Sequence, residues 1–380
     1  MKKIGAAIAG YLRTIDKWLI ILWGGASAAS ILFLYGLYVT DFAKSDTVVK
    51  QVIAIGIGVF AAFFISLFDY HTILKLWKLF FPLCLFLVLL TFFIGDSGRT
   101  DEAWINIPLG FFSFSLQPSE LLKISFILTM AIHLDKIHEN INSIPNVFSL
   151  LIHGGFHVIL IQLQGDSGSA LVFVFIFLIM VFFAGISWKY IAAAFTALIP
   201  AVYVIWFYIM DPYQQMRFKI LWDPDLDAAY AYQQARGRLA LGVGGIQGTG
   251  LFSGGHVYVP EIYNDFIFAF VGESMGFMGC LGVIALLTAI CLKLLYNSSL
   301  AADNHGRLIF IGIFAMIFSQ TVINLGMCTS ILPVVGVTLP LFSSGGTSAI
   351  ALYMSLGIAL SVYRHSATGL FFTDKGMKKI

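Results

Sequence analysis

The stretch ALVFVFIFLIMVFFA at residues 170–184 is apolar at every position. A helix that crosses a membrane needs about 20 mostly apolar residues, and similar runs recur along the chain. A membrane-spanning β-barrel would instead show segments of about ten residues in which apolar and polar side chains alternate. The uninterrupted runs therefore predict a helical membrane protein.

The composition indicates a protein whose solvent is largely lipid. Hydrophobic residues make up 59% of the 380 residues and charged residues 11%, whereas soluble domains carry roughly 25% charged residues. A chain this apolar cannot cover itself with polar surface. The start, MKKIGAAIAGYLRTIDK, has no long uninterrupted apolar core and no A-x-A site, so we expect no cleavable signal peptide.

We expect an all-α integral membrane protein with about ten transmembrane helices, forming a single domain over residues 1–380. The predicted spans are 18–39, 48–68, 74–95, 118–134, 147–163, 169–185, 188–209, 265–292, 308–328 and 344–363. Two segments between spans, 96–117 and 210–264, are too long to be simple connections. The aromatic residues and glycines of 210–264, between the seventh and eighth spans, predict a loop that folds against the membrane surface.

The distribution of lysine and arginine predicts the orientation. With the amino terminus inside, fourteen of these residues fall in inner segments and seven in outer segments, and Lys123 within a span completes the 22. Cytoplasmic segments carry the excess of positive charge in membrane proteins. We therefore expect both termini in the cytoplasm and both long segments outside.

Ionisable residues near the outer ends of the predicted spans are the first functional candidates, because charge at membrane depth is costly. They are Glu120, Lys123, Asp166, Asp265 and Glu273. A shared outward-facing cavity would account for their clustering. An ion pair between Lys123 and Asp166 would keep each of them charged, and it would serve equally well to brace helices or to take part in catalysis.

Asp265 has two interpretations that the residues alone leave open. It begins the eighth predicted span in PEIYNDFIFAFVGESMGFMG, with Glu261 one turn before it and Glu273 about two turns after it. A partly desolvated carboxylate at this junction tends toward the pKa of a general base. The same carboxylate could instead cap the helix and complement its dipole.

Glycines cluster at residues 242–255 and in the string SSGGTS before the last predicted span. A phosphate cradle is one interpretation, formed where Ser343, Ser344, Gly345 and Gly346 precede the helix. Tight re-entrant turns are the other. The spacing matches neither a Walker A motif nor a dinucleotide fingerprint, and we expect no nucleic-acid partner.

Six strings together resemble the SEDS family, the group of RodA, FtsW and SpoVE. They are WINIPLG, QPSELLKISFIL, GDSGSALV, YQQARGRLALGVGGIQGTG, VPEIYNDFIFAFVGESMGFMG and NLGMCTSILPVVGVTLPLFSSGGTSAI, and they occur in the family's order along nearly the whole chain. The length and the short termini are more similar to the RodA branch. The sequence departs from the family's pattern at four positions. The arginine that usually precedes the tryptophan is missing before Trp104, and whether Arg99 replaces it is left open. Gly165, Ser344 and Thr347 stand in place of the family's usual residues.

The resemblance implies a peptidoglycan glycosyltransferase that polymerises lipid II on the outer face of the bacterial cytoplasmic membrane. It implies a class B penicillin-binding protein as partner, within the elongation or division machinery. The family's essential aspartate maps to Asp265, and its supporting residues map to Lys123, Asp166 and Glu273. Glu120 and Glu261 lie beside them as further supporting candidates.

A pyrophosphate leaving group gathers negative charge that needs cations. The candidates are Arg217, Lys219, Arg236 and Arg238 in segment 210–264, or a bound divalent cation, Mg or Mn. The competing interpretations are a lipid II flippase, a non-enzymatic scaffold, and an enzyme of the FtsW or SpoVE branch that serves division or sporulation.

Overall fold

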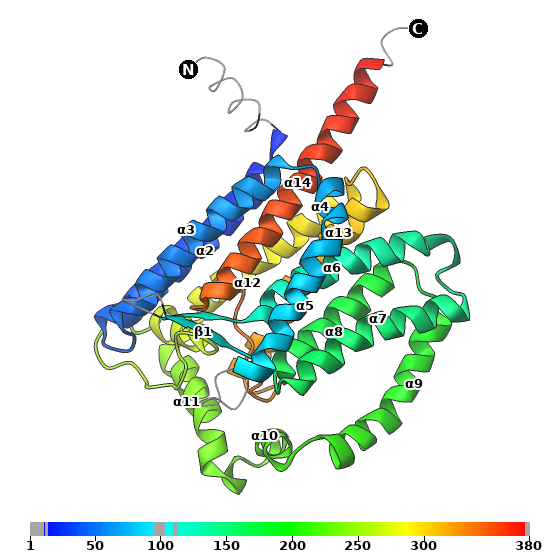
Figure 1. Ribbon diagram of the computed structural model, residues 1–380. Coiled ribbons are helices and arrows are strands. Elements are labelled where there is room, and N and C mark those ends of the chain that lie inside the picture. The colour runs from blue at the N-terminus through cyan, green and yellow to red at the C-terminus, as the bar shows by residue number, and fades with distance from the viewer. Residues whose placement is uncertain (1–10, 12–13, 95–102, 109–112, 377–380) are drawn as a thin grey trace, which may run out of the picture.

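All the segments predicted to cross the membrane are helical in the computed structural model (Figure 1), which describes residues 11, 14–94, 103–108 and 113–376. In chain order these helices are α2 (Lys17–Val39), α3 (Ser45–Leu67), α5 (Trp77–Ile94), α6 (Pro118–Lys136), α7 (Ile144–Leu163), α8 (Ser167–Phe183), α9 (Trp188–Val204), α12 (Ile267–Ser299), α13 (Asn304–Cys328) and α14 (Gly346–Gly376). The short helix α4 (Tyr70–Lys75) precedes α5, and a π-helical turn, η2 (Ile205–Ile209), continues α9.

Eight of the described helices are long and apolar enough to cross a membrane. The other two predicted spans differ in ways that their sequences explain. Helix α8 is apolar but short, with 17 residues, and α6 carries Glu120, Lys123, Asp135 and Lys136. The chain is therefore a multi-pass helical membrane protein, and the number ten stays a prediction.

Both long segments between the predicted spans contain regular structure. Residues 210–264 include α10 (Pro212–Trp222), the 3-10 turn η3 (Pro224–Leu226) and α11 (Ala228–Gly244), which packs along α12. The segment 96–117 contains a hairpin of β1 (Ile105–Pro108) and β2 (Ser113–Leu116), in which Ile105 pairs with Leu116. A further 3-10 turn, η1 (His138–Asn140), links α6 to α7. The hairpin was not among the elements predicted from the sequence.

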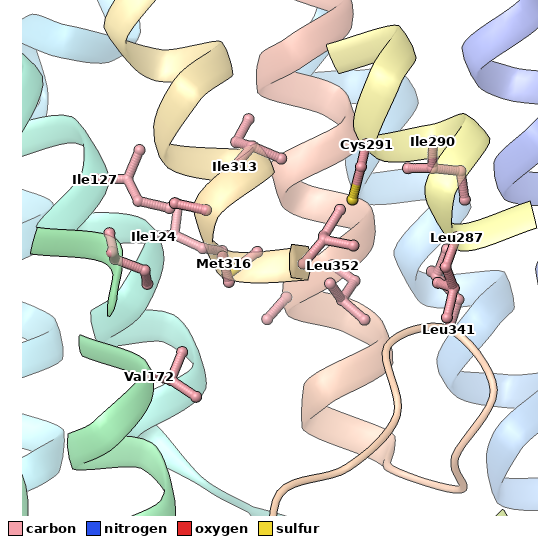
Figure 2. Close-up of a cluster of buried hydrophobic side chains, with 14 of the residues drawn as sticks. Ile124, Ile127, Val172, Leu287, Ile290, Cys291, Ile313, Met316, Leu341 and Leu352 are labelled. Atoms are coloured by element: carbon pink, nitrogen blue, oxygen red, sulfur yellow. The ribbon is translucent and has the colours of Figure 1, made fainter. Parts of the chain in front are cut away.

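The centre of the bundle is a cluster of buried apolar side chains to which most of the helices contribute. Figure 2 shows part of this cluster, in which Ile124 of α6 extends toward Met316 of α13, and Val172 of α8 and Leu352 of α14 lie nearby. By contrast, none of the residues of α9, all of which the structure describes, is buried. An apolar helix without a buried face is typical of a helix that crosses a membrane.

Helices α3 and α14 lie side by side along most of their lengths (Figure 1). Two glycines allow this approach. A Cβ atom on Gly58 would lie 2.8 Å from Cβ of Tyr353, and one on Gly357 would lie 2.7 Å from the backbone oxygen of Ala62. Small residues serve in this way between membrane helices, where packing rather than water drives association.

Helix α12 is broken at Gly276, whose φ and ψ are 67° and −163°. The glycine-rich stretch that follows α11 fills this break. Thr249 and Gly250 donate backbone hydrogen bonds of 2.9 Å to the oxygens of Glu273 and Ser274, which the broken helix leaves unpaired. The stretch is thus a turn that closes on α12, as one of its two interpretations predicted.

Candidate active site

A cavity of about 2230 Å³ opens at the end of the bundle that carries the hairpin, whose residue Ser115 lines it. Its walls come from the turn between α2 and α3, the start of α6, the turn between α7 and α8, and α10. Residues 261 and 263–265, ahead of α12, complete the walls together with residues 333–338, between α13 and α14. Segments that lie far apart in the sequence therefore meet around one space.

The cavity brings together most of the predicted site residues. Those that line it are Asp265, Lys123, Asp166, Glu120, Glu261, Arg217, Ser344, Gly345 and Gly346. Those that do not are Glu273, Lys219, Arg236, Arg238 and Ser343. The roles that the resemblance implies for both groups stay predictions, but the geometry supports only the first group as contacts for a bound molecule.

Asp265 lies just outside the first turn of α12. The N-cap position is Phe266, whose side chain makes no capping hydrogen bond. The Asp265 carboxylate instead lies beside the connection from α13 to α14, because a Cβ atom on Gly336 would be 3.7 Å from its Oδ2 atom. The geometry thus favours a carboxylate at the cavity wall over one that caps the helix.

The backbone that carries Asp265 is held at three consecutive residues. The oxygen of Tyr263 accepts a 2.8 Å hydrogen bond from the backbone nitrogen of Ser344. The oxygen of Asn264 accepts one of 2.6 Å from the hydroxyl of Ser343, and the oxygen of Asp265 accepts one of 2.8 Å from the amide of Asn324. Each bond restricts the main chain, so the position of the carboxylate is set before any ligand binds.

The turn that contains Ser343 and Ser344 is itself anchored to α3. Gln51 donates through Nε2 to the backbone oxygen of Ser343 at 3.2 Å and accepts at Oε1 from the backbone nitrogen of Gly345 at 3.2 Å. Ser343 therefore supports the aspartate segment from behind the cavity wall, which explains why it does not line the cavity.

Lys123 is almost completely buried, with 1% of its side chain exposed. Its Nζ lies 2.8 Å from Oε1 of Glu120, one turn earlier in α6. Asp166 lines the same cavity and accepts hydrogen bonds from Nε2 of Gln117 at 2.9 Å and from the backbone nitrogen of Ser169 at 2.8 Å. The ion pair proposed between Lys123 and Asp166 stays a prediction, and Glu120 is the partner that the structure assigns to Lys123.

The cations around the cavity differ from those expected. Arg217 lines it, and its guanidinium donates to the backbone oxygen of Val334 at 2.7 Å and to the hydroxyl of Tyr213. Lys44 and Lys50 line it too, although they were not among the site residues predicted from the sequence. Both were among the few lysines of the predicted outer segments, and this could have marked them as candidates for an outward-facing cavity.

Glu273 and Arg236 lie behind the cavity and hold the segment that leads to Asp265. Oε1 of Glu273 accepts a 2.7 Å hydrogen bond from the backbone nitrogen of Val257, and its Oε2 lies 3.6 Å from Nδ1 of His256. Arg236 donates from Nε to the backbone oxygen of Tyr258 at 2.8 Å. These contacts are structural, and we place neither residue among the ligand contacts.

No three His, Cys, Asp or Glu side chains of the described residues converge as a metal site requires. Arg99, which the sequence left open as a substitute for the family's arginine, lies outside the described residues.

The fold and the cavity define a multi-pass membrane protein whose helical bundle holds, at one end, a cavity lined by both charged and apolar side chains. Comparison with known proteins identifies it further: the chain belongs to the FtsW/RodA/SpoVE family, described as cell cycle proteins, which matches residues 17–368.

Named relatives come from several branches of this family. The chain is 31% identical over 287 residues to the peptidoglycan glycosyltransferase MrdB of Escherichia coli. The aligned region covers 74% of this chain and 76% of MrdB. It is 32% identical over 323 residues to the stage V sporulation protein E of Bacillus subtilis, and this aligned region covers 83% of this chain and 87% of that protein.

Two solved structures share the fold. One is a chain from the work described as "Structural coordination of polymerization and crosslinking by a peptidoglycan synthase complex", with a TM-score of 0.77, 26% identity, and coverage of 93% of this chain and 98% of that one. The other is the rod shape determining protein RodA of Thermus thermophilus, with a TM-score of 0.68, 26% identity, and coverage of 92% and 97%.

Proposed function

We infer that this protein is a peptidoglycan glycosyltransferase that polymerises lipid II into glycan strands. The observation that carries the inference is the single cavity in which Asp265 and the buried Lys123 both lie. A carboxylate held in a fixed position can accept a proton, and a buried cation in the same cavity can stabilise an anionic leaving group. The pair therefore suits a reaction that needs both. The names of the relatives, among them the peptidoglycan glycosyltransferase MrdB, support the same activity.

In the proposed reaction, Asp265 accepts the proton of the 4-hydroxyl on the N-acetylglucosamine of the acceptor. The oxygen attacks the anomeric carbon of the donor's N-acetylmuramic acid and inverts it, while the bond to undecaprenyl pyrophosphate breaks. The braced backbone at residues 263–265 supports this assignment, because a general base must be held within hydrogen-bond reach of its proton.

The pyrophosphate leaves as an anion and needs positive charge rather than a proton. Lys123 is buried and Arg217 is partly buried, and both line the cavity, so we assign the stabilisation of the leaving group to them. For Lys219, Arg236 and Arg238 the cavity gives no such support. A bound Mg or Mn ion is the other candidate for this charge, because such an ion is usually held by one or two carboxylates together with the phosphates of the substrate.

We propose that the cavity faces the outside of the bacterial cytoplasmic membrane and that both termini are cytoplasmic. The excess of lysine and arginine in the segments of the opposite side supports this orientation. We also propose a class B penicillin-binding protein as partner. The structural relative from a complex that coordinates polymerization and crosslinking supports a transpeptidase partner of this kind.

The test is to incubate the purified chain, with a class B penicillin-binding protein, with lipid II and to separate the products by size. Glycan strands are the expected result. A lipid II flippase would instead move labelled lipid II across vesicle membranes and form no strands, which would contradict the proposal. The phenotype of cells depleted of the protein then distinguishes elongation, division and sporulation. Loss of rod shape is the result expected for the RodA-like role that we propose.

A further inference from the structure

A smaller pocket of about 290 Å³ lies between α10 and α11 and shares part of its wall with the cavity. The residues that line both are Tyr213, Arg217, Gln233 and Val334, and those that line the pocket alone are Ile220, Ala229 and Tyr230. Neither Asp265 nor Lys123 lines the pocket. A molecule that reacts in the cavity can therefore extend into the pocket, and the part that enters lies away from the reacting atoms.

Two tyrosine rings meet in the wall of this pocket. The ring centroids of Tyr213 and Tyr230 are 5.3 Å apart, with an angle of 60° between the rings. Cζ of Arg217 lies 4.4 Å from the centroid of the Tyr213 ring, and the guanidinium donates to the Tyr213 hydroxyl. Tyr213 is thus held by protein contacts, whereas Tyr230 is 36% exposed and presents the more open ring to a bound molecule.

The lining combines aromatic and aliphatic side chains with a few polar groups, and this mixture distinguishes between possible occupants. A hydrocarbon tail would cover Arg217, Gln233 and the tyrosine hydroxyls with apolar surface, which is costly for polar groups. An anion would find Arg217 as the one charged residue among the described residues that line the pocket, whereas the cavity also offers it Lys123. A sugar ring has apolar C–H faces that can lie on an aromatic ring and hydroxyl groups that can bond to a guanidinium and an amide.

We propose that the pocket between α10 and α11 binds one sugar ring of the growing glycan strand, beyond the rings that react. This inference rests on the proposed function. The volume is close to the lower limit of about 300 Å³ for ligand pockets, which suits a single ring. Figure 1 shows α10 and α11 at the opposite end of the molecule from the end of α14. The pocket therefore lies on the side assigned to the outside, through which a strand leaves.

The substitution Tyr230→Ala tests this by removing the more open ring, and Tyr230→Phe keeps the ring. A contact beyond the reacting rings does not take part in bond formation, but it slows release of the strand between additions. For Tyr230→Ala we therefore expect an initial rate of lipid II consumption close to that of the wild type. The mean strand length should fall by about fivefold, the effect of one lost aromatic contact. Tyr230→Phe should make strands of wild-type length. Unchanged strands from Tyr230→Ala, or equally short strands from Tyr230→Phe, would contradict the proposal.

Tyr232→Ala is the matched control. Tyr232 lies two residues later in α11 and is 46% exposed, but it lines neither the pocket nor the cavity. Loss of its ring should leave the strand length unchanged. If Tyr232→Ala shortens the strands as much as Tyr230→Ala does, the effect belongs to α11 in general and the inference is wrong.

A probe without lipid, pyrophosphate or peptide separates this inference from the proposed function. In saturation-transfer NMR, chitotetraose, an oligomer of N-acetylglucosamine, should receive signal from the wild type and from Tyr232→Ala, and clearly less from Tyr230→Ala. Equal signals from all three proteins, or none from the wild type, would mean that the pocket takes the peptide part of lipid II or no part of it, and the inference is wrong. If chitotetraose binds through Tyr230 but the wild type makes no glycan from lipid II, the proposed function fails and the saccharide site stands.

Discussion

Nδ2 of Asn324 lies 2.8 Å from the backbone oxygen of Asp265 and, through the same nitrogen, 2.7 Å from the backbone oxygen of Val337. One fully buried amide thus joins the start of α12 to the connection between α13 and α14. The two segments form adjoining walls of the cavity. The position of the proposed base depends on this side chain, although Asn324 itself does not line the cavity.

Replacing Asn324 by Leu should therefore lower both stability and activity. The change keeps the size of the side chain and leaves two backbone oxygens without their donor, at a cost of about 1–3 kcal/mol. We expect a lower thermal midpoint and a lower rate of lipid II polymerisation per folded molecule. Asn297→Leu is the control, because Asn297 is also buried but bonds to Asp16 at the other end of the bundle. It should lose stability only, and equal activity in the two variants would contradict the account.

Lys123→Met should be strongly destabilising, because Glu120 is then left buried without its cation. Removing one partner of a buried pair costs about 3–5 kcal/mol. The double variant Lys123→Met, Glu120→Gln removes both charges, so its thermal midpoint should recover towards that of the wild type. Its polymerisation activity should stay low, since the cation assigned to the leaving group is gone. Recovery of activity together with stability would show that Lys123 is only a structural residue.

The stability of the protein should survive loss of the charge of Glu273 but not loss of its Oε1 atom as a hydrogen-bond acceptor. Gln at this position keeps an acceptor for the backbone nitrogen of Val257, whereas Leu leaves that partly buried nitrogen unpaired, at a cost of up to about 1–3 kcal/mol. We expect Glu273→Gln to keep the thermal midpoint within a few degrees and Glu273→Leu to lower it clearly. Equal midpoints for the two variants would mean that Val257 finds another acceptor.

A pH-dependent contribution to stability is expected at the opposite end of the bundle, between the predicted spans α3 and α5. His71 lies 3.0 Å from Asp69 through Nδ1 and 2.9 Å from Asp303 through Nε2, so it joins two turns of the chain. Burial alone lowers the pKa of the His71 imidazole, but hydrogen bonds to the two carboxylates outweigh it, and the net shift of the pKa is upward.

A raised pKa means that protonated His71 stabilises the fold. The contribution is complete below the ordinary histidine pKa of about 6.5 and disappears as the pH rises through the raised value. His71→Gln should remove this component, so that the gap in thermal midpoint between wild type and variant narrows as the pH rises from about 6 to about 9. A gap that is constant over this range would contradict the assignment.

The helical membrane fold could be predicted from the sequence, because each span depends only on a local run of apolar residues such as 170–184. The hairpin of β1 and β2 was missed because its strands are four residues each and lie within a segment interpreted as a loop. The alternation of serine and aromatic residues around Phe114 was a signal for it.

The site was predictable only in part. Asp265, Lys123 and Asp166 stand out locally as charges beside apolar runs. The partners that hold them do not, because Gln117 and Asp166 are 49 positions apart and Asn324 and Asp265 are 59 apart. The choice between a capping and a cavity-facing Asp265 likewise needed the position of Gly336, which the sequence alone does not fix. Such contacts depend on the packing of segments that lie far apart in the chain, and this packing cannot be predicted from local patterns in a single sequence.

The most direct test of the central claim is lipid II polymerisation by Asp265→Asn beside the wild type, each with a class B penicillin-binding protein. Asn has the shape of Asp but cannot accept the proton at neutral pH. The account predicts no glycan strands from the variant, with an unchanged thermal midpoint and unchanged partner binding. Strand formation by Asp265→Asn at the wild-type rate would contradict the assignment of Asp265 as the base.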